Sequence, residues 1–152
     1  ENRMLNRRQE RITELSKPED ILYKERLERL TNNFERFFGE LKDSQVMILE
    51  SHTHLTLGES RVRLHNRTLR QKVFIRFLRT QPTEMDLTNY LNTLLLKGHT
   101  ITNSSYQAFS EKSLNRFHTL LVNLLANSSK VQREKIINKL RDYAKDFKAV
   151  SG

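Results

Sequence analysis

The chain has 152 residues, which suits one folded domain, and we predict a single helical domain over residues 1–152. Its 27 lysine and arginine residues against 18 acidic residues give a net charge of +9, which favours anionic partners such as nucleic acid, anionic lipid, lipopolysaccharide or an acidic protein. The lack of cysteine excludes disulfides, thiolate metal sites and cysteine nucleophiles, and no apolar run approaches the roughly 20 residues that span a bilayer. An alternative is that the excess charge only keeps a helical protein in solution.

Residues 1–15 predict a very polar helix with a thin apolar stripe of Leu5, Ile12 and Leu15 among many arginines. Because this helical pattern is already under way at Glu1, we expect the chain to be a fragment of a longer protein that lacks its N-terminus. Any targeting sequence would then have been upstream of the fragment.

A second helix is expected over about residues 17–38, where residues 16–19 have the composition of a capping box with Pro18 in the first turn. Its apolar residues alternate at spacings of three and four, which is typical of a helix packed along another helix. Gly39 should end this helix in a left-handed conformation. The apolar face consists of Leu27, Leu30, Phe34, Phe37 and Phe38.

The next helix should start with Asp43 as its N-cap, bury a dense apolar turn at residues 46–49, and falter near Gly58. A basic helix over residues 59–80 follows. Pro82 and Thr83 then begin a shorter helix that ends at Gly98, before a loop over residues 98–103. We expect Gly58 and Gly98, like Gly39, to be left-handed C-caps.

Residues 104–151 predict two long helices folded back on each other. Residues 104–107 have the composition of one capping box, and residues 129–132 that of another, in which Ser129 and Gln132 bond reciprocally. Between the helices, residues 127–129 are long enough only to reverse the chain. The fold class is therefore all-α: a bundle of six to seven helices that ends in a long antiparallel helical hairpin, with no convincing strand.

A weak internal repeat links two of these helix starts. Residues 41–45 and residues 129–132 both follow a turn, and each precedes an apolar-rich helix. The eight phenylalanines are expected to lie in the core, although part of this set could instead form an apolar groove for a partner or for the missing N-terminal portion.

The strongest electrostatic signal is the basic helix at residues 59–80, which has Glu59 as its single acidic residue. Its cations form two stripes at helical spacing, and either stripe could hold the phosphates of lipid headgroups or nucleic acid. Nucleic acid would also require aromatic or amide side chains on the same face, for which Asn66 and Gln71 are the nearby candidates. Alternatively, the face is merely solvated and pairs with acids of neighbouring helices. The candidate site residues are Arg63, Arg67 and Arg70 in one stripe, and Lys72, Arg76 and Arg79 in the other.

No residue pattern indicates catalysis, a cofactor or a metal. His52 and His54 are two positions apart, so on a helix they point about 200° away from each other and cannot easily share an ion. Serines fall at helix caps, and glycines fall at helix ends and the C-terminus rather than in a phosphate-binding loop. With no nucleophile–base pair visible, we predict that the protein is not an enzyme.

Several segments resemble the C-terminal portion of a family of proteobacterial lipoproteins of unknown function. The family's recurrent phrase is Leu-Thr-x-x-Gln before a helix, and here Lys42 and Ser129 stand at the two threonine positions. Because Lys42 cannot cap a helix, the first of these helices should start at Asp43. The same phrase is similar to one in small periplasmic stress chaperones. The matching segments are residues 15–19, 25–30, 37–45, 129–133 and 140–147.

The resemblance implies a lipid-modified cysteine upstream of Glu1, and hence a periplasmic domain on a membrane anchor. It supplies no catalytic residues. We therefore predict a non-enzymatic domain of the cell envelope that binds a macromolecule or an anionic surface. Two alternatives are a helical nucleic-acid-binding module and a periplasmic chaperone-like protein.

Overall fold

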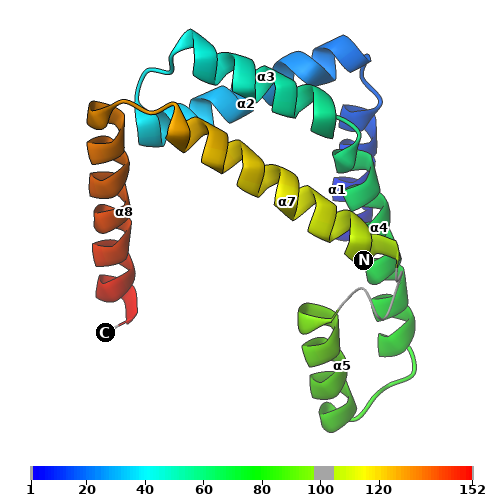
Figure 1. Cartoon of the computed structure of the whole chain (residues 1–152). Coiled ribbons are helices and arrows are strands. Elements are labelled where there is room, and N and C mark those ends of the chain that lie inside the picture. Colours follow the sequence, from blue (N-terminus) through cyan, green and yellow to red (C-terminus); the bar gives the residue numbers. More distant parts are fainter. Residues whose placement is uncertain (1, 98–104, 152) are drawn as a thin grey trace. The chain divides into compact units, whose positions relative to one another are not determined.

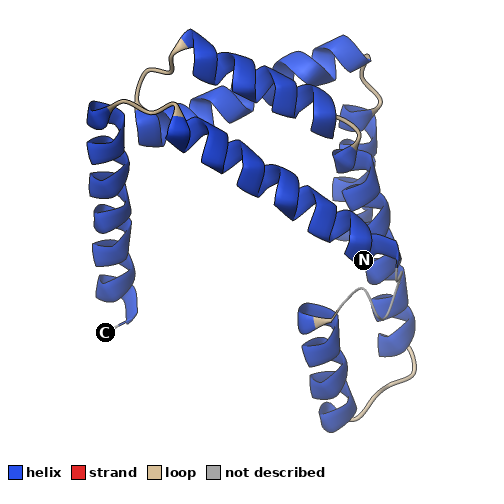
Figure 2. Ribbon diagram, in the orientation of Figure 1, coloured by secondary structure: helices blue, strands red, loops and turns tan. Residues whose placement is uncertain are grey.

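The computed structural model describes residues 2–97 and 105–151, and within these ranges it contains seven helices and no strand (Figures 1 and 2). The predicted all-helical class is confirmed. The helices are α1 (Asn2–Leu15), α2 (Glu19–Phe38), α3 (Asp43–Thr56), α4 (Glu59–Leu78), α5 (Glu84–Leu96), α7 (Ser105–Ala126) and α8 (Lys130–Ser151).

The chain divides into two compact units. Unit 1 consists of Glu1–Lys17 with Gly58–Asn115, and therefore holds α1, α4, α5 and the first half of α7. Unit 2 consists of Pro18–Leu57 with Arg116–Gly152, and holds α2, α3, the rest of α7 and α8.

The apolar core lies in unit 2. It is formed by Phe38, Leu49, Leu120 and Leu124, all of which are buried. In unit 1, by contrast, the described side chains that are buried are polar: Glu59, Asn66 and Ser113. Because apolar burial is the main driving force of folding, unit 2 carries most of the hydrophobic stabilisation of the described structure.

Two buried glutamines join the helices of unit 2. The side-chain amides of Gln45 in α3 and Gln132 in α8 donate to each other's Oε1 atoms, at 3.3 and 3.0 Å. Each Oε1 also accepts the backbone N–H at its own helix start, from Lys42 and Ser129 respectively, at 3.0 Å in both cases. The two members of the weak sequence repeat therefore lie next to each other, and the side-chain amide at each helix start hydrogen-bonds to the amide at the other.

The remaining amide hydrogens of this glutamine junction bond to backbone carbonyls. Gln132 Nε2 donates to the carbonyl oxygen of Glu40 at 2.9 Å, and Gln45 Nε2 donates to that of Leu124 at 3.5 Å. Every donor and acceptor of both buried amides is thereby used, which removes the penalty for burying polar groups. The junction also orients both amides, because only an oxygen can accept from the two backbone N–H groups.

The two helices of the expected antiparallel hairpin follow each other along the chain, but they do not pack along each other. A short turn separates α7 and α8, and the predicted capping box at Ser129 and Gln132 is confirmed by a 3.2 Å bond from the Gln132 backbone N–H to Ser129 Oγ. However, α8 packs against α2 rather than along α7. Phe37 of α2 contacts Tyr143 of α8, with ring centroids 5.9 Å apart, and Ile136 of α8 packs on the core that includes Phe38 of α2.

Fewer side chains of α3, α7 and α8 are buried than the sequence predicts. In the apolar turn at residues 46–49 only Leu49 is buried, and Met47 is exposed, because a helix presents a single side of each turn to its neighbours. Two phenylalanines assigned to the core, Phe117 and Phe147, are also exposed. Phe147 lies in the part of α8 that runs beyond its contacts with the core, so no packed neighbour covers it.

Two of the predicted helix starts need correction. Ser16 does not cap α2, because its hydroxyl donates to the carbonyl oxygen of Ile12 in the preceding helix, and Pro18 takes the N-cap position. α3 starts at Asp43 as expected, but Asp43 is the first helical residue and Lys42 occupies the N-cap. The Gln45 side chain accepts the Lys42 backbone N–H, and the Gln45 backbone N–H, which a capping side chain would otherwise accept, donates to the Lys42 carbonyl oxygen at 2.9 Å. The expected capping box at residues 104–107 begins outside the described residues.

The glycines behave differently from one another. Gly39 ends α2 with φ +76°, which confirms the predicted positive φ, but its ψ of −152° lies outside the left-handed helical region of the expected C-cap. Gly58 has φ −74° and ψ −13° and precedes α4 as its N-cap, so the left-handed C-cap expected there is wrong. α3 passes into α4 through Leu57 and Gly58 without any left-handed residue to reverse the chain. Gly98 lies outside the described residues.

Replacing Gln45 by Ala is expected to lower the free energy of unfolding by about 2–3 kcal/mol, because Gln132 and two backbone groups lose buried partners. The double variant Q45A/Q132A should cost less than the sum of the two single variants, since each single change already breaks the shared bonds. Urea unfolding followed by circular dichroism measures both, with Gln9→Ala on the exposed surface of α1 as the control. Additive losses would show that the two amides do not act as one unit.

Alanine at Gly39 and at Gly58 should give opposite results. At Gly39 the combination of φ +76° and ψ −152° is strained for any side chain, so Gly39→Ala should cost about 1–3 kcal/mol. At Gly58 a Cβ would meet no atom within 4 Å and φ is ordinary, so Gly58→Ala should leave the melting temperature unchanged or raise it. Equal melting temperatures for the two variants would contradict this description of the chain reversal at Gly39.

Candidate anion-binding site

Unit 1 packs α1 against α4 through few apolar side chains. Ile12 and Leu15 of α1 are half-buried and border a hollow with Leu64 of α4. The Arg61 guanidinium of α4 donates to the carbonyl oxygen of Leu15 at 3.2 Å, and so satisfies one of the free carbonyls at the end of α1. This thin apolar contact leaves the rest of the α1–α4 boundary to charged side chains.

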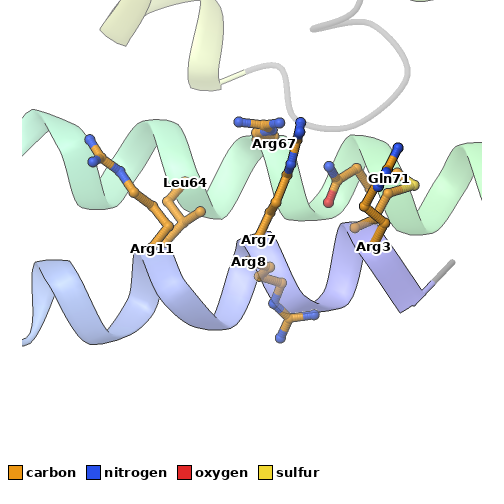
Figure 3. A pocket seen from close by; sticks show the side chains of 8 residues that line it. Arg3, Arg7, Arg8, Arg11, Leu64, Arg67 and Gln71 are labelled. Carbon is orange, nitrogen blue, oxygen red and sulfur yellow. The ribbon is translucent and has the colours of Figure 1, made fainter.

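A narrow hollow between α1 and α4, of about 190 Å³, is lined by five arginines together with Met4, Leu64 and Gln71. Arg3, Arg7 and Arg11 are four residues apart, so they form one stripe along α1. Figure 3 shows the tip of Arg7 rising toward α4 beside Arg67, while Arg8 points away from α4. We call this hollow the arginine groove and define it by Arg3, Arg7, Arg11, Arg67 and Gln71.

The arginine groove is poor in negative charge. Arg11 is paired with Glu14 of its own helix. Over residues 2–97 and 105–151, no ion pair or hydrogen bond joins Arg3, Arg7 or Arg67 to any carboxylate. Like charges brought together without a counter-charge repel each other, so the groove is a region of concentrated positive charge.

A second hollow of about 420 Å³ adjoins the first, because Arg67 and Gln71 line both. It adds Arg63 and Arg70 from the first predicted stripe. It also contains amide and aromatic side chains: Asn66, Gln71 and Phe74 from α4, and Tyr106 from α7. The structure thus brings one predicted stripe together with the arginines of α1 in a continuous basic track, which consists of the arginine groove and this second hollow.

Arg63 has a structural role in this track. Its guanidinium donates to the Glu59 carboxylate at 2.8 Å and to the hydroxyl of Ser113, and it lies 5.7 Å from the ring centroid of Phe109. Ser113 in turn donates to the same carboxylate at 2.6 Å. Because the Glu59 side chain is only 7% exposed, this pairing supplies the charge that the buried carboxylate requires, and it fastens α7 to α4.

Arg70 fastens α5 to α4. Its guanidinium donates to the carbonyl oxygen of Leu94 near the end of α5. Tyr90 of α5 stacks on Phe77 of α4, with centroids 4.1 Å apart and planes at 8°. Burial raises the pKa of the Tyr90 phenol, and the nearby positive charge of Arg70 partly opposes that shift. Arg67 is therefore the arginine of the predicted stripe whose charge no described partner uses.

The second predicted stripe lies on the other side of α4. At 100° per residue, Lys72, Arg76 and Arg79 are turned about 180° from the stripe of Arg63, Arg67 and Arg70. All three are exposed, and none lines either hollow. The six candidate cations thus occupy two opposite faces rather than one site.

Sequence reasoning missed the contribution of α1. Its arginines at positions 3, 7 and 11 follow the same spacing that singled out the 59–80 helix, so the signal was available. What the sequence could not show is that α1 packs against α4, a helix that begins 44 residues after α1 ends. Tyr106 had no such signal, because its place in the track depends on where α7 begins.

The part of the chain that the structure describes holds no group of three or more side chains able to ligate a metal. His54 stacks on Tyr23, with ring centroids 4.2 Å apart. None of the described helices combines the length and the apolar character needed to cross a bilayer. Comparison with protein-family models, with curated proteins and with solved structures finds no match for this chain.

The different roles of Arg63 and Arg67 predict different effects on stability. Arg63→Glu places a second carboxylate against buried Glu59 and should lower the free energy of unfolding by about 2 kcal/mol. Arg67→Glu removes like-charge repulsion and breaks no ion pair or hydrogen bond among the described residues, so stability should change by less than about 0.5 kcal/mol or rise. Thermal unfolding of both variants checks this, and a larger loss for Arg67→Glu would contradict the assignment.

Proposed function

We propose that this chain is a non-enzymatic binding domain whose basic track holds a phosphate-bearing anionic surface. The observation that carries the proposal is the convergence of Arg7 and Arg67 from two different helices with no carboxylate between them. A bound anion would replace their mutual repulsion by attraction to both side chains.

The choice of arginine favours phosphate as the ligand group. A guanidinium offers planar, paired N–H donors that match phosphate oxygens, and it stays charged at all physiological pH values. Arginines at i, i+4 and i+8 repeat about every 6 Å along α1, given a rise of about 1.5 Å per residue. Such a row meets several anionic groups at once, as on a surface, rather than enclosing a single ion.

A cell-envelope location belongs to the same proposal. It is supported by the resemblance of residues 15–19, 25–30, 37–45, 129–133 and 140–147 to proteobacterial lipoproteins. In a periplasmic domain held near a membrane by an upstream lipid anchor, the anionic partner would be a phosphate-bearing envelope component. The anchor would raise the local concentration of that partner, so a weak basic track would suffice.

Nucleic acid is a second candidate, favoured by one specific observation. Phe74 and Tyr106 line the second hollow beside Arg67 and Arg70. Single-stranded nucleic acid is held by cationic side chains along its backbone and by aromatic rings that stack on its bases. The structure thus places Phe74 of the basic helix and Tyr106 of α7 beside these arginines.

The double variant R7E/R67E should lose binding to vesicles of phosphatidylcholine that contain about one third phosphatidylglycerol. Each arginine near an anionic surface contributes about 1 kcal/mol, so the affinity should fall about thirtyfold or more. Cosedimentation of the protein with vesicles measures the change. The matched control is the charge reversal K72E/R76E on the opposite face of α4, which alters the net charge equally.

Equal losses in R7E/R67E and K72E/R76E would mean that only net charge matters, and would overturn the assignment of the site. Wild-type binding should weaken as salt rises from about 50 to 200 mM, since exposed charges are screened. A mobility shift with single-stranded and duplex DNA forms the second arm. Tight DNA binding that R7E/R67E abolishes, with no vesicle binding, would replace the anionic surface by nucleic acid.

A further inference from the structure

The end of α5 exposes two consecutive leucines beside the basic track. Leu95 and Leu96 are 74% and 79% exposed, more than any other leucine among the described residues. Single exposed apolar side chains are common on protein surfaces and need no explanation. A pair at the tip of a helix, next to a concentration of positive charge, is the combination found where proteins rest on a membrane surface.

The structure fixes this leucine tip, defined as Leu95 and Leu96, to the basic track. The preceding residue, Leu94, lines the second hollow, and its carbonyl oxygen accepts a hydrogen bond from Arg70. The leucines and the arginines therefore belong to one surface of unit 1 and can contact the same partner.

The rest of α5 is built to hold the tip in place. Its start is closed by a capping box in which Thr83 Oγ1 accepts the backbone N–H of Asp86 at 3.2 Å. Its middle is held by the stacking of Tyr90 on Phe77. Leu91 and Leu94 are half-buried, whereas the leucine tip has no such cover, so its exposure is not shared by the other apolar side chains of the helix end.

We propose that the leucine tip inserts into the interfacial region of an anionic phospholipid bilayer while the basic track binds the lipid phosphates. This inference rests on the proposed function and names the bilayer as the anionic surface. Leucines add a hydrophobic contribution to binding that salt does not screen, whereas the arginine contribution is screened. Binding at high salt should therefore depend on the tip, and binding at low salt on both.

The orientation of α5 follows from its polar residues. Met85 lies 11 positions before Leu96, on nearly the same side of the helix and about 16 Å away along its axis. Between them on that side lie the exposed residues Asn89 and Asn92, whose amides would lose hydrogen bonds to water inside lipid. α5 therefore meets the bilayer with its end and not with its length.

The chain contains no tryptophan, so a single introduced indole reports its own surroundings. In the presence of the vesicles described above, Leu96→Trp should show a blue-shifted emission and quenching by brominated lipid. The matched reporter Met85→Trp, at a side chain that is 71% exposed on the same helix, should show neither effect. Equal shifts at both positions would mean that α5 lies flat, and no shift at either would mean that the tip stays in water; each result overturns the inference.

The variant L95S/L96S separates this inference from the proposed function. Each leucine that leaves water should strengthen vesicle binding by about tenfold at any salt concentration, so the variant should bind about 100-fold more weakly than the wild type at both about 50 and about 200 mM salt. The binding that remains at about 50 mM should come from the arginines and should be lost at about 200 mM. Unchanged binding at both salt concentrations would overturn insertion while leaving the basic track as the site. If the wild-type chain binds no anionic vesicle at all, the proposed function itself fails. Circular dichroism verifies that L95S/L96S keeps its helices.

Discussion

The reciprocal bonds between Gln45 and Gln132 are the interaction on which the arrangement of unit 2 depends. Each amide accepts the backbone N–H at its own helix start, bonds to the other amide, and donates to a backbone carbonyl. A buried polar contact of this kind tolerates little displacement, because any shift leaves several groups unpaired at once. Apolar packing around Leu49 and Leu124 supplies stabilisation, and the glutamine junction decides which helix lies against which.

Unit 1 is constructed on a different principle. Its described buried side chains are polar, and its helices are held by ion pairs, by arginines that reach carbonyl groups, and by the stacking of Tyr90. Using Arg63 and Arg70 in these roles leaves Arg67, with Arg3 and Arg7 of α1, as the arginines of the basic track for which the described residues supply no ion pair or hydrogen bond. Concentrating charge in this way opposes stability, which is typical of surfaces that bind a ligand.

The relation between prediction and structure differs from one element to the next. The helix starts at Ser129 and Thr83 follow their local sequence closely, because a capping box involves residues only three positions apart. Ser16 has the same composition but bonds to the preceding helix instead, since a hydroxyl can satisfy either a helix start or a helix end. The stripe of Arg63, Arg67 and Arg70 was visible from spacing, whereas the structural role of Arg63 was not, because it depends on Ser113 far along the chain.

By itself the sequence determined that this protein is all-helical, where most of its helices begin and end, and that its surface is strongly basic. These properties depend on short-range periodicity, caps and composition, which the chain carries locally. Only the tertiary structure decided that α8 packs on α2 and not along α7, that the two faces of α4 have different neighbours, and that the arginines of α1 complete a basic track. Those outcomes depend on contacts between residues far apart in sequence, and the free energy that selects among them resides in shared burial and in hydrogen bonds such as those of the glutamine junction.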